Sequence, residues 1–269
     1  MGVGFHIVVC GSLVPDPLQT LEPVETPSGP GLKNELMLPS VLDPWAAHAL
    51  YEAAHLATRT PDSRVWLVSL GPKAKLQQLM MTVAQKAPFD LIAIDGPAGG
   101  FTDAHETAAV LADAIQQIEG LDRSRLLLFG GWSSASRDAG VTLHMAGERL
   151  GIRDQFAGVD EMSPLEDGSF TVKERIEGGQ YQVSRCAGPP AVLAWATGNL
   201  PEPPNNPQVG MANMRGIMPA LQRAKVVSQL DGGIGFQSVR VPQQRRDTRV
   251  IKDMSSEQIA VEVVDWIST

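Results

Sequence analysis

Small, flexible residues follow four stretches of the chain that have the pattern of buried β-strands. Glycine, serine or proline occurs at residues 10–12, 70–72, 95–100 and 130–131. Glycine lets a ligand approach the main chain closely, and N–H groups at the start of a following helix attract anions. Ligands of open parallel sheets bind beyond the carboxyl ends of the strands, so this pattern predicts a nucleotide site there.

The last of these segments, residues 130–140, carries the most polar groups. Three serine hydroxyls and the guanidinium of Arg137 precede the expected start of a helix. Such groups are together suited to holding a phosphate. A second interpretation stays open, in which Asp138 caps the helix and pairs with Arg137 without any ligand. The chain has no Gly-Lys-Ser/Thr phosphate loop and no Gly-x-Gly-x-x-Gly motif after its first strand.

Groups that do covalent chemistry form no recognisable pattern. None of the five histidines stands near a nucleophile in a strained turn. Asp95 follows a predicted strand, where it has the position of a general base and equally that of a turn cap. Cys10 and Cys186 are far apart, which predicts two thiols packed as small apolar side chains and no metal or dithiol site. We therefore predict no catalytic residue.

The elements that must position these residues alternate along the first part of the chain. Runs that are apolar almost throughout predict strands at 5–10, 64–70, 91–95 and 125–129, as expected for strands covered on both faces. Segments of helical periodicity lie between them, and Asp43-Pro44 begins one of these. This order predicts an α/β fold with a Rossmann-like, mostly parallel sheet and helices on both faces.

The second part of the chain has a different pattern. From 156 to 198 the period changes to two, which predicts hairpins that extend the sheet. A loop rich in proline and asparagine, 199–213, is expected to precede a helix at 214–225, and a capping box at 255–258 to begin a last helix. We predict a nucleotide-binding domain over residues 1–225 and a C-terminal arm over 226–269.

Bulk composition limits the partners. The 269 residues are 43% hydrophobic, enough for a well-buried core, and the formal net charge of -8 argues against nucleic acid. No apolar run approaches the length of about 20 residues that a membrane span needs. We therefore expect a cytoplasmic protein with no membrane span. The segment 13–42 is longer than most loops, which is typical of functional or disordered segments.

Several motifs agree in order with one known family. They are Ser12-Leu13-Val14-Pro15-Asp16, Leu42-Asp43-Pro44-Trp45, and Met214-Arg215-Gly216-Ile217-Met218 with Ala220. With them the chain resembles the beta subunit of electron transfer flavoproteins, the small subunit of an alpha/beta heterodimer with an adenine nucleotide alpha-hydrolase-like fold. The third motif is the most specific of these.

The resemblance implies an electron carrier subunit rather than an enzyme. It would pair with an alpha subunit that holds most of the FAD, accept electrons from a flavin-dependent dehydrogenase and pass them to a downstream acceptor. An AMP would lie in its own fold, and its C-terminal arm would wrap the partner subunit. Two alternatives remain, an electron-bifurcating type with a second FAD in this subunit, and a stand-alone adenine-nucleotide-binding protein or hydrolase.

The resemblance also assigns roles to residues of this chain. The nucleotide would contact Cys10, Gly11, Asp43, Leu70, Gly71, Gly131, Ser134, Arg137, Asp138, Ala139 and Gly140. Trp45 would lie near the flavin of the alpha subunit, and Met214 and Arg215 would dock the dehydrogenase. Residues 134–138 depart from the family's Asp-x-Asp-x-x-Gln-x-Gly pattern, so the bound nucleotide stays open between AMP, FAD and none.

Overall fold

The computed structural model describes residues 4–26, 29–97, 102–135, 140–227, 250 and 252–268. The chain divides into two compact units, Met1–Gln237 and Ser238–Thr269. In the second unit a single helix is described, α6 (Ser256–Ile267), and it begins with the predicted capping box between Ser255 and Gln258. All other described elements belong to the first unit.

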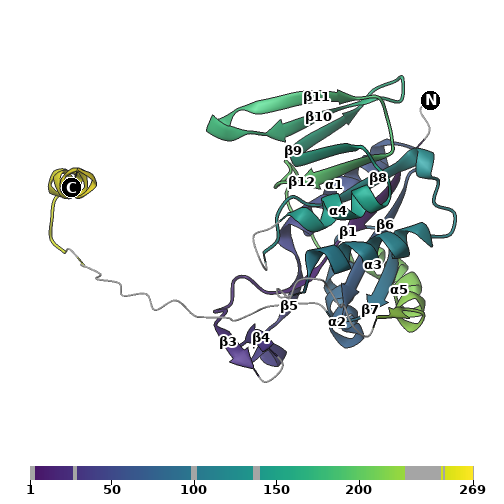
Figure 1. The fold of residues 1–269 in the computed structure, drawn as a ribbon, viewed down its shortest axis with the longest axis horizontal. Helices are drawn as coiled ribbons and strands as arrows, with labels where there is room; N and C mark the ends of the chain where they lie inside the picture. Colours follow the sequence, from purple (N-terminus) through teal and green to yellow (C-terminus); the bar gives the residue numbers. More distant parts are fainter. Residues whose placement is uncertain are drawn as a thin grey trace. The chain divides into compact units, whose positions relative to one another are not determined.

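A nine-stranded sheet organises the first unit (Figure 1). Its strands are β1 (His6–Cys10), β6 (Arg64–Gly71), β7 (Asp90–Asp95), β8 (Leu126–Gly131), β9 (Asp154–Pro164), β10 (Phe170–Arg175), β11 (Tyr181–Cys186), β12 (Ala191–Trp195) and β13 (Lys225–Val226). Their order is β11-β10-β9-β12-β8-β1-β6-β7-β13. All neighbouring pairs are parallel except those that β10 makes with β9 and β11. The predicted mostly parallel sheet with a hairpin extension is therefore confirmed.

Helices cover both faces of this sheet. They are α1 (Pro44–Arg59), α2 (Lys73–Val83), α3 (Ala104–Gln116), α4 (Val141–Arg149) and α5 (Pro207–Gln222), with three short 3-10 turns, η1 (Glu35–Met37), η2 (Arg123–Arg125) and η3 (Glu177–Gly179). Apolar residues of α1, α2 and α5 form one core cluster, and those of α3 and α4 form the other. Along β1, Ile7 and Val9 enter the first cluster and Val8 the second, so both faces of the strand are buried.

The segment between β1 and α1 is ordered in its described part. It forms two short antiparallel pairs, β2 (Leu13–Pro15) with β5 (Ser40–Leu42), and β3 (Pro23–Thr26) with β4 (Gly29–Leu32). The interpretation of this segment as disordered is therefore wrong for these residues. Main-chain hydrogen bonds between the paired strands explain the order.

Helix α5 begins seven residues before the predicted start at 214, because Asn206 and Pro207 begin it there. The Asn206 side chain accepts hydrogen bonds from the N–H groups of Gln208 and Val209, and Pro207 occupies the first helical turn. The longest described helices, α1 and α5, have 16 residues each, so no helix in the described part of the chain could cross a bilayer.

Candidate functional site

A pocket of about 130 Å³ lies at the carboxyl edge of the sheet. The ends of β1, β6 and β8 form its floor, and the first turns of α1 and α4 stand at its rim together with residues of α3. The central strands thus converge on one hollow, as predicted from the small residues that follow them.

Glycines shape the walls of the pocket because side chains pack tightly behind them. A Cβ at Gly11 would lie 2.8 Å from Leu42 Cδ1, and one at Gly131 would lie 2.5 Å from Trp45 Cβ. A Cβ at Gly140 would collide with the main-chain oxygen of Trp132. These positions therefore accept no larger residue without movement of the wall.

Asp43 is the buried carboxylate of the pocket, with 2% of its surface exposed. Its Oδ1 accepts the N–H of Trp45 at 3.0 Å, which caps α1, and its Oδ2 accepts the N–H of Ala135 at 2.8 Å. Burial raises the pKa of Asp43, and hydrogen bonds from Ala135, Trp45, Ala46 and Ser134 partly oppose that rise. The carboxylate thus joins the start of α1 to the loop after β8.

Three of the five described helices of the first unit have a carboxylate at their start. Asp43 caps α1, Asp103 Oδ1 accepts the N–H of His105 at the start of α3, and Asp95 Oδ1 accepts the N–H of Lys73 at the start of α2. Helix α4 has Gly140 at its N-cap and no side-chain cap. Because Gly140 and Thr142 line the pocket, the first turn of α4 opens into it.

Cys10 lines the pocket as a neutral thiol. Burial raises the pKa of Cys10 to about 12, so the group is protonated at neutral pH. Next to it, the Ser69 hydroxyl donates a hydrogen bond of 2.7 Å to the carbonyl of Gly11 and fixes the turn after β1. Cys10 and Cys186 form no disulfide with each other. The thiol of Cys10 contributes an apolar surface rather than a nucleophile.

Most of the predicted nucleotide-contacting residues that the structure describes meet at this pocket. Those in the lining are Cys10, Gly11, Asp43, Leu70, Gly131, Ser134 and Gly140. Gly71 ends β6 and is buried outside the lining, while Arg137, Asp138 and Ala139 lie outside the described residues. The sequence reasoning missed Thr107 and Thr142, whose signal was their place in the first turns of α3 and α4, and Leu111, which lies further along α3.

Trp45 is half-buried behind the pocket wall and is not part of the lining. Its Cβ faces Gly131, and its indole Nε1 is buried with no hydrogen-bond partner among the described residues. The predicted contact of Trp45 with a flavin stays a prediction.

Asp95 does not line the pocket. Its carboxylate caps α2, and its carbonyl accepts the N–H of Val227 at 2.8 Å beside the β7–β13 pair. Of the two roles left open for Asp95, the structure places it in the capping role.

Met214 and Arg215 lie on α5, which packs against α2 and β7. Met214 is half-buried and packs against the core cluster of α1, α2 and α5, whereas Arg215 is exposed. The exposed apolar side chain of this helix is Met211. The role of Met214 in docking stays a prediction. Because Met214 also packs against the core, a test must separate docking from packing.

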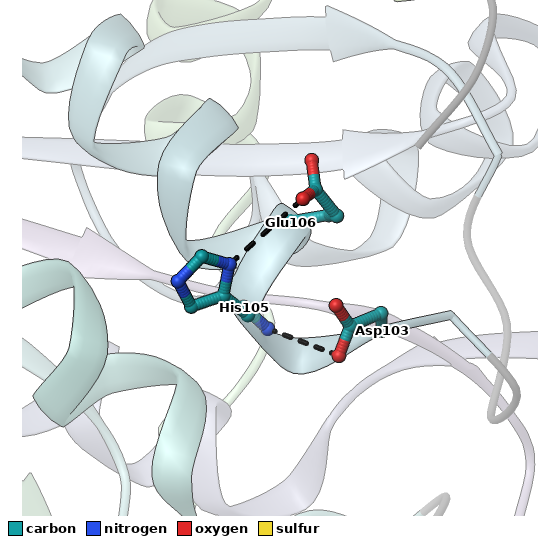
Figure 2. Close-up of side chains that lie close together, drawn as sticks. All are labelled: Asp103, His105 and Glu106. Carbon is teal, nitrogen blue, oxygen red and sulfur yellow. Dashed lines mark hydrogen bonds and ion pairs between the residues drawn. The ribbon is translucent and has the colours of Figure 1, made fainter. Parts of the chain in front are cut away.

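A group of possible metal ligands stands at the start of α3 and includes Asp103, His105 and Glu106 (Figure 2). Its members already have other partners. His105 Nδ1 lies 3.8 Å from Glu106 Oε1, its Nε2 lies 3.2 Å from Arg149 Nη2, and Asp103 caps the helix. A guanidinium beside the imidazole opposes a cation, so we assign this group to the helix start.

Comparison with known proteins adds the family. The family model of the electron transfer flavoprotein domain matches residues 34–228. This span includes most of the pocket-lining residues and all of α5. A search of curated proteins found no match. Since the matched span covers well over half of the chain, the protein belongs to the electron transfer flavoprotein domain family.

Proposed function

We propose that this chain is the beta-type subunit of an electron transfer flavoprotein. It holds one AMP in the pocket at the carboxyl edge of its sheet and pairs with an alpha subunit that carries most of the FAD. The complex accepts electrons from a flavin-dependent dehydrogenase and passes them to a downstream acceptor. The proposal rests on the family match together with the chemistry of the pocket.

The observation that carries the AMP assignment is the uncapped start of α4. Its N-cap is Gly140, which has no side chain to accept from the first N–H groups, and the pocket opens onto this helix start. A phosphate supplies oxygens and a negative charge that suit a helix N-terminus. Among the described residues, the starts of α1, α2 and α3 are capped by Asp43, Asp95 and Asp103, so we assign the phosphate to the start of α4.

The rest of the lining suits a nucleoside. Leu13, Leu70 and Leu111 supply apolar surface, and the glycine turns let a flat ring approach the main chain. The neutral thiol of Cys10 adds to this apolar surface. A base and sugar therefore find a matching slot beside the phosphate position.

One phosphate is favoured over two in this pocket. Asp43 is a carboxylate close to the turn after β8, and a second phosphate there would be repelled by it. The electron-bifurcating alternative, with a second FAD in this subunit, would have to place a diphosphate beside that carboxylate. AMP avoids this conflict.

Two surfaces of the chain have the chemistry expected for binding the proposed dehydrogenase and alpha subunit. Neither α2 nor α5 contains Asp or Glu, while Lys73, Lys75 and Arg215 lie on them, which suits an acidic dehydrogenase. In the second unit, α6 exposes Val263 and Trp266 at helical spacing, and the alpha subunit would cover this apolar face. Both surfaces fit a subunit that binds other proteins.

The test is to purify the chain alone and co-expressed with its alpha subunit, and to record absorbance spectra of both. We expect flavin absorbance only in the co-purified complex. Acid extraction followed by chromatography should release one AMP for each copy of this chain. Release of a second FAD would support the bifurcating type instead, and nucleotide hydrolysis by the chain alone would overturn the carrier role.

A further inference from the structure

The two small strand pairs between β1 and α1 belong to one antiparallel ribbon with a single register. Leu13 pairs with Leu42 and Thr26 with Gly29, and every step along one strand is matched by one step along the other. The register continues past the regular pairs. Asp16 N–H donates to the carbonyl of Pro39 at 2.9 Å, and Lys33 N–H donates to that of Glu22 at 2.9 Å. We call residues 13–26 and 29–42 the ribbon; it projects from the carboxyl edge of the sheet (Figure 1).

Midway along the ribbon the strands separate and present two apolar side chains. Leu18 is two residues after Asp16, and Met37 is two residues before Pro39. Both therefore lie where the regular pairing of the two strands is interrupted. Leu18 lies in a turn that Asp16 Oδ1 holds by accepting its N–H at 3.0 Å, and Met37 ends the short turn η1. Leu18 is 91% and Met37 84% exposed, the two highest values for large apolar side chains in the described part of the chain.

Charges around these two side chains are mostly negative. The ribbon carries Asp16, Glu22, Glu25 and Glu35 but only one cation, Lys33. The ammonium of Lys33 is 2.8 Å from a carboxylate oxygen of Glu22, so the remaining carboxylates dominate the surface. A partner that matches this surface has basic side chains around an apolar hollow.

We propose that the ribbon is a docking element that inserts Leu18 and Met37 into an apolar hollow, bordered by lysine or arginine, on the alpha subunit. This inference rests on the proposed function. Two apolar side chains that are exposed to water almost completely lower the free energy of the chain when a partner buries them. The basic side chains of α2 and α5 suit an acidic dehydrogenase, whereas the acidic ribbon suits a basic partner, which favours the alpha subunit as its occupant.

The apolar anchors and the carboxylates have different tasks in this arrangement. Buried apolar anchors slow dissociation, so the Leu18→Ser, Met37→Ser double variant should raise the dissociation constant for the alpha subunit at least about tenfold. The matched control is Val183→Ser, an apolar residue that is 68% exposed on the edge strand β11, outside the ribbon. The control should bind within about twofold of the wild type.

The carboxylates are tested by the Glu25→Gln, Glu35→Gln variant of the full chain. Its association with the purified alpha subunit should be slower by about threefold to tenfold at low salt and should respond less to added salt. Both rates can be measured by stopped-flow mixing of the separated subunits. Circular dichroism of each variant confirms that the fold is kept.

The outcomes separate this inference from the proposed function. A wild-type chain that does not pair with the alpha subunit overturns both. Wild-type pairing with unchanged affinity in the ribbon variants overturns the docking role alone. If the heterodimer stays intact while electron uptake from the dehydrogenase falls, the ribbon serves the dehydrogenase and the alpha subunit is the wrong occupant.

Discussion

The Asp43 carboxylate accepts the main-chain N–H of Ala135 at 2.8 Å, although the two residues are 92 positions apart in the chain. The same carboxylate caps α1 by accepting the N–H of Trp45. Asp43 and the neighbouring Ser134 both line the pocket, so one buried side chain ties two walls of the candidate nucleotide site together. The loop after β8 therefore depends on the start of α1 for its position.

Replacing Asp43 should cost more than the loss of an ordinary helix cap. Asp43→Ala removes the cap of α1 and leaves the Ala135 N–H without its acceptor, so we expect a loss of about 2–4 kcal/mol in the free energy of unfolding. The matched variant Asp103→Ala removes the cap of α3 alone and should cost about 1 kcal/mol. Urea unfolding followed by circular dichroism measures both. Equal losses would show that the bond to Ala135 contributes nothing.

Two glycines should respond to alanine in opposite directions. Gly140→Ala places a methyl group onto the main-chain oxygen of Trp132, so we expect a loss of about 3 kcal/mol or more and weaker nucleotide binding. Gly216 lies inside α5, and a Cβ there would meet nothing within 4 Å. Gly216→Ala should therefore stabilise the protein by up to about 1 kcal/mol. A pair of urea unfolding curves tests both signs, and destabilisation by Gly216→Ala would contradict the open surroundings of this site.

Glu52 on α1 should make stability depend on pH. Its Oε1 accepts the N–H of Asn199 at 3.3 Å, while burial raises the pKa of Glu52 above its usual value. A raised folded pKa means that the contribution of Glu52 to stability is complete below the unfolded value of about 4.5 and is lost as pH rises through the folded value. Glu52→Gln keeps an acceptor and has no charge to desolvate.

The variant should therefore gain stability relative to the wild type as pH rises above about 4.5 and show a constant difference once Glu52 is fully ionised. Urea unfolding from about pH 4 to about pH 8 measures the difference. Because Asp43 titrates in both proteins, it cancels from the comparison. A difference that does not change with pH would contradict the raised pKa.

The fold was largely predictable because its signals are local. Apolar runs such as β8, flanked by amphipathic segments, specify strands buried on both faces, and Asp43-Pro44 specifies the start of α1. The start of α5 carried the same kind of signal in Asn206-Pro207, and the prediction missed it because the proline and asparagine residues of 199–213 indicated a loop. Local chemistry there was the better guide.

The site was predictable only in part because its key contacts join distant segments. The glycine turns after β1 and β8 were visible in the sequence, and the pocket forms between them. The bond from Ala135 to Asp43 and the choice of α4 as the uncapped helix depend on how loops meet in three dimensions. The same holds for Asp95, whose capping of α2 follows from the neighbouring position of β6 and β7.

Docking and packing by α5 can be separated with two methionines of one helix face. Met214 and Met218 are both half-buried, lie four residues apart and pack against the same core cluster. Met214→Ala and Met218→Ala should each cost about 1–2 kcal/mol of stability. If Met214 also docks the dehydrogenase, Met214→Ala but not Met218→Ala should raise the apparent KM of the dehydrogenase for this flavoprotein, by about tenfold. The exposed Arg215 should give the complementary result, because Arg215→Gln should change the KM while leaving the free energy of unfolding within about 0.5 kcal/mol. Equal kinetic losses for the two methionine variants would mean that Met214 acts only through packing.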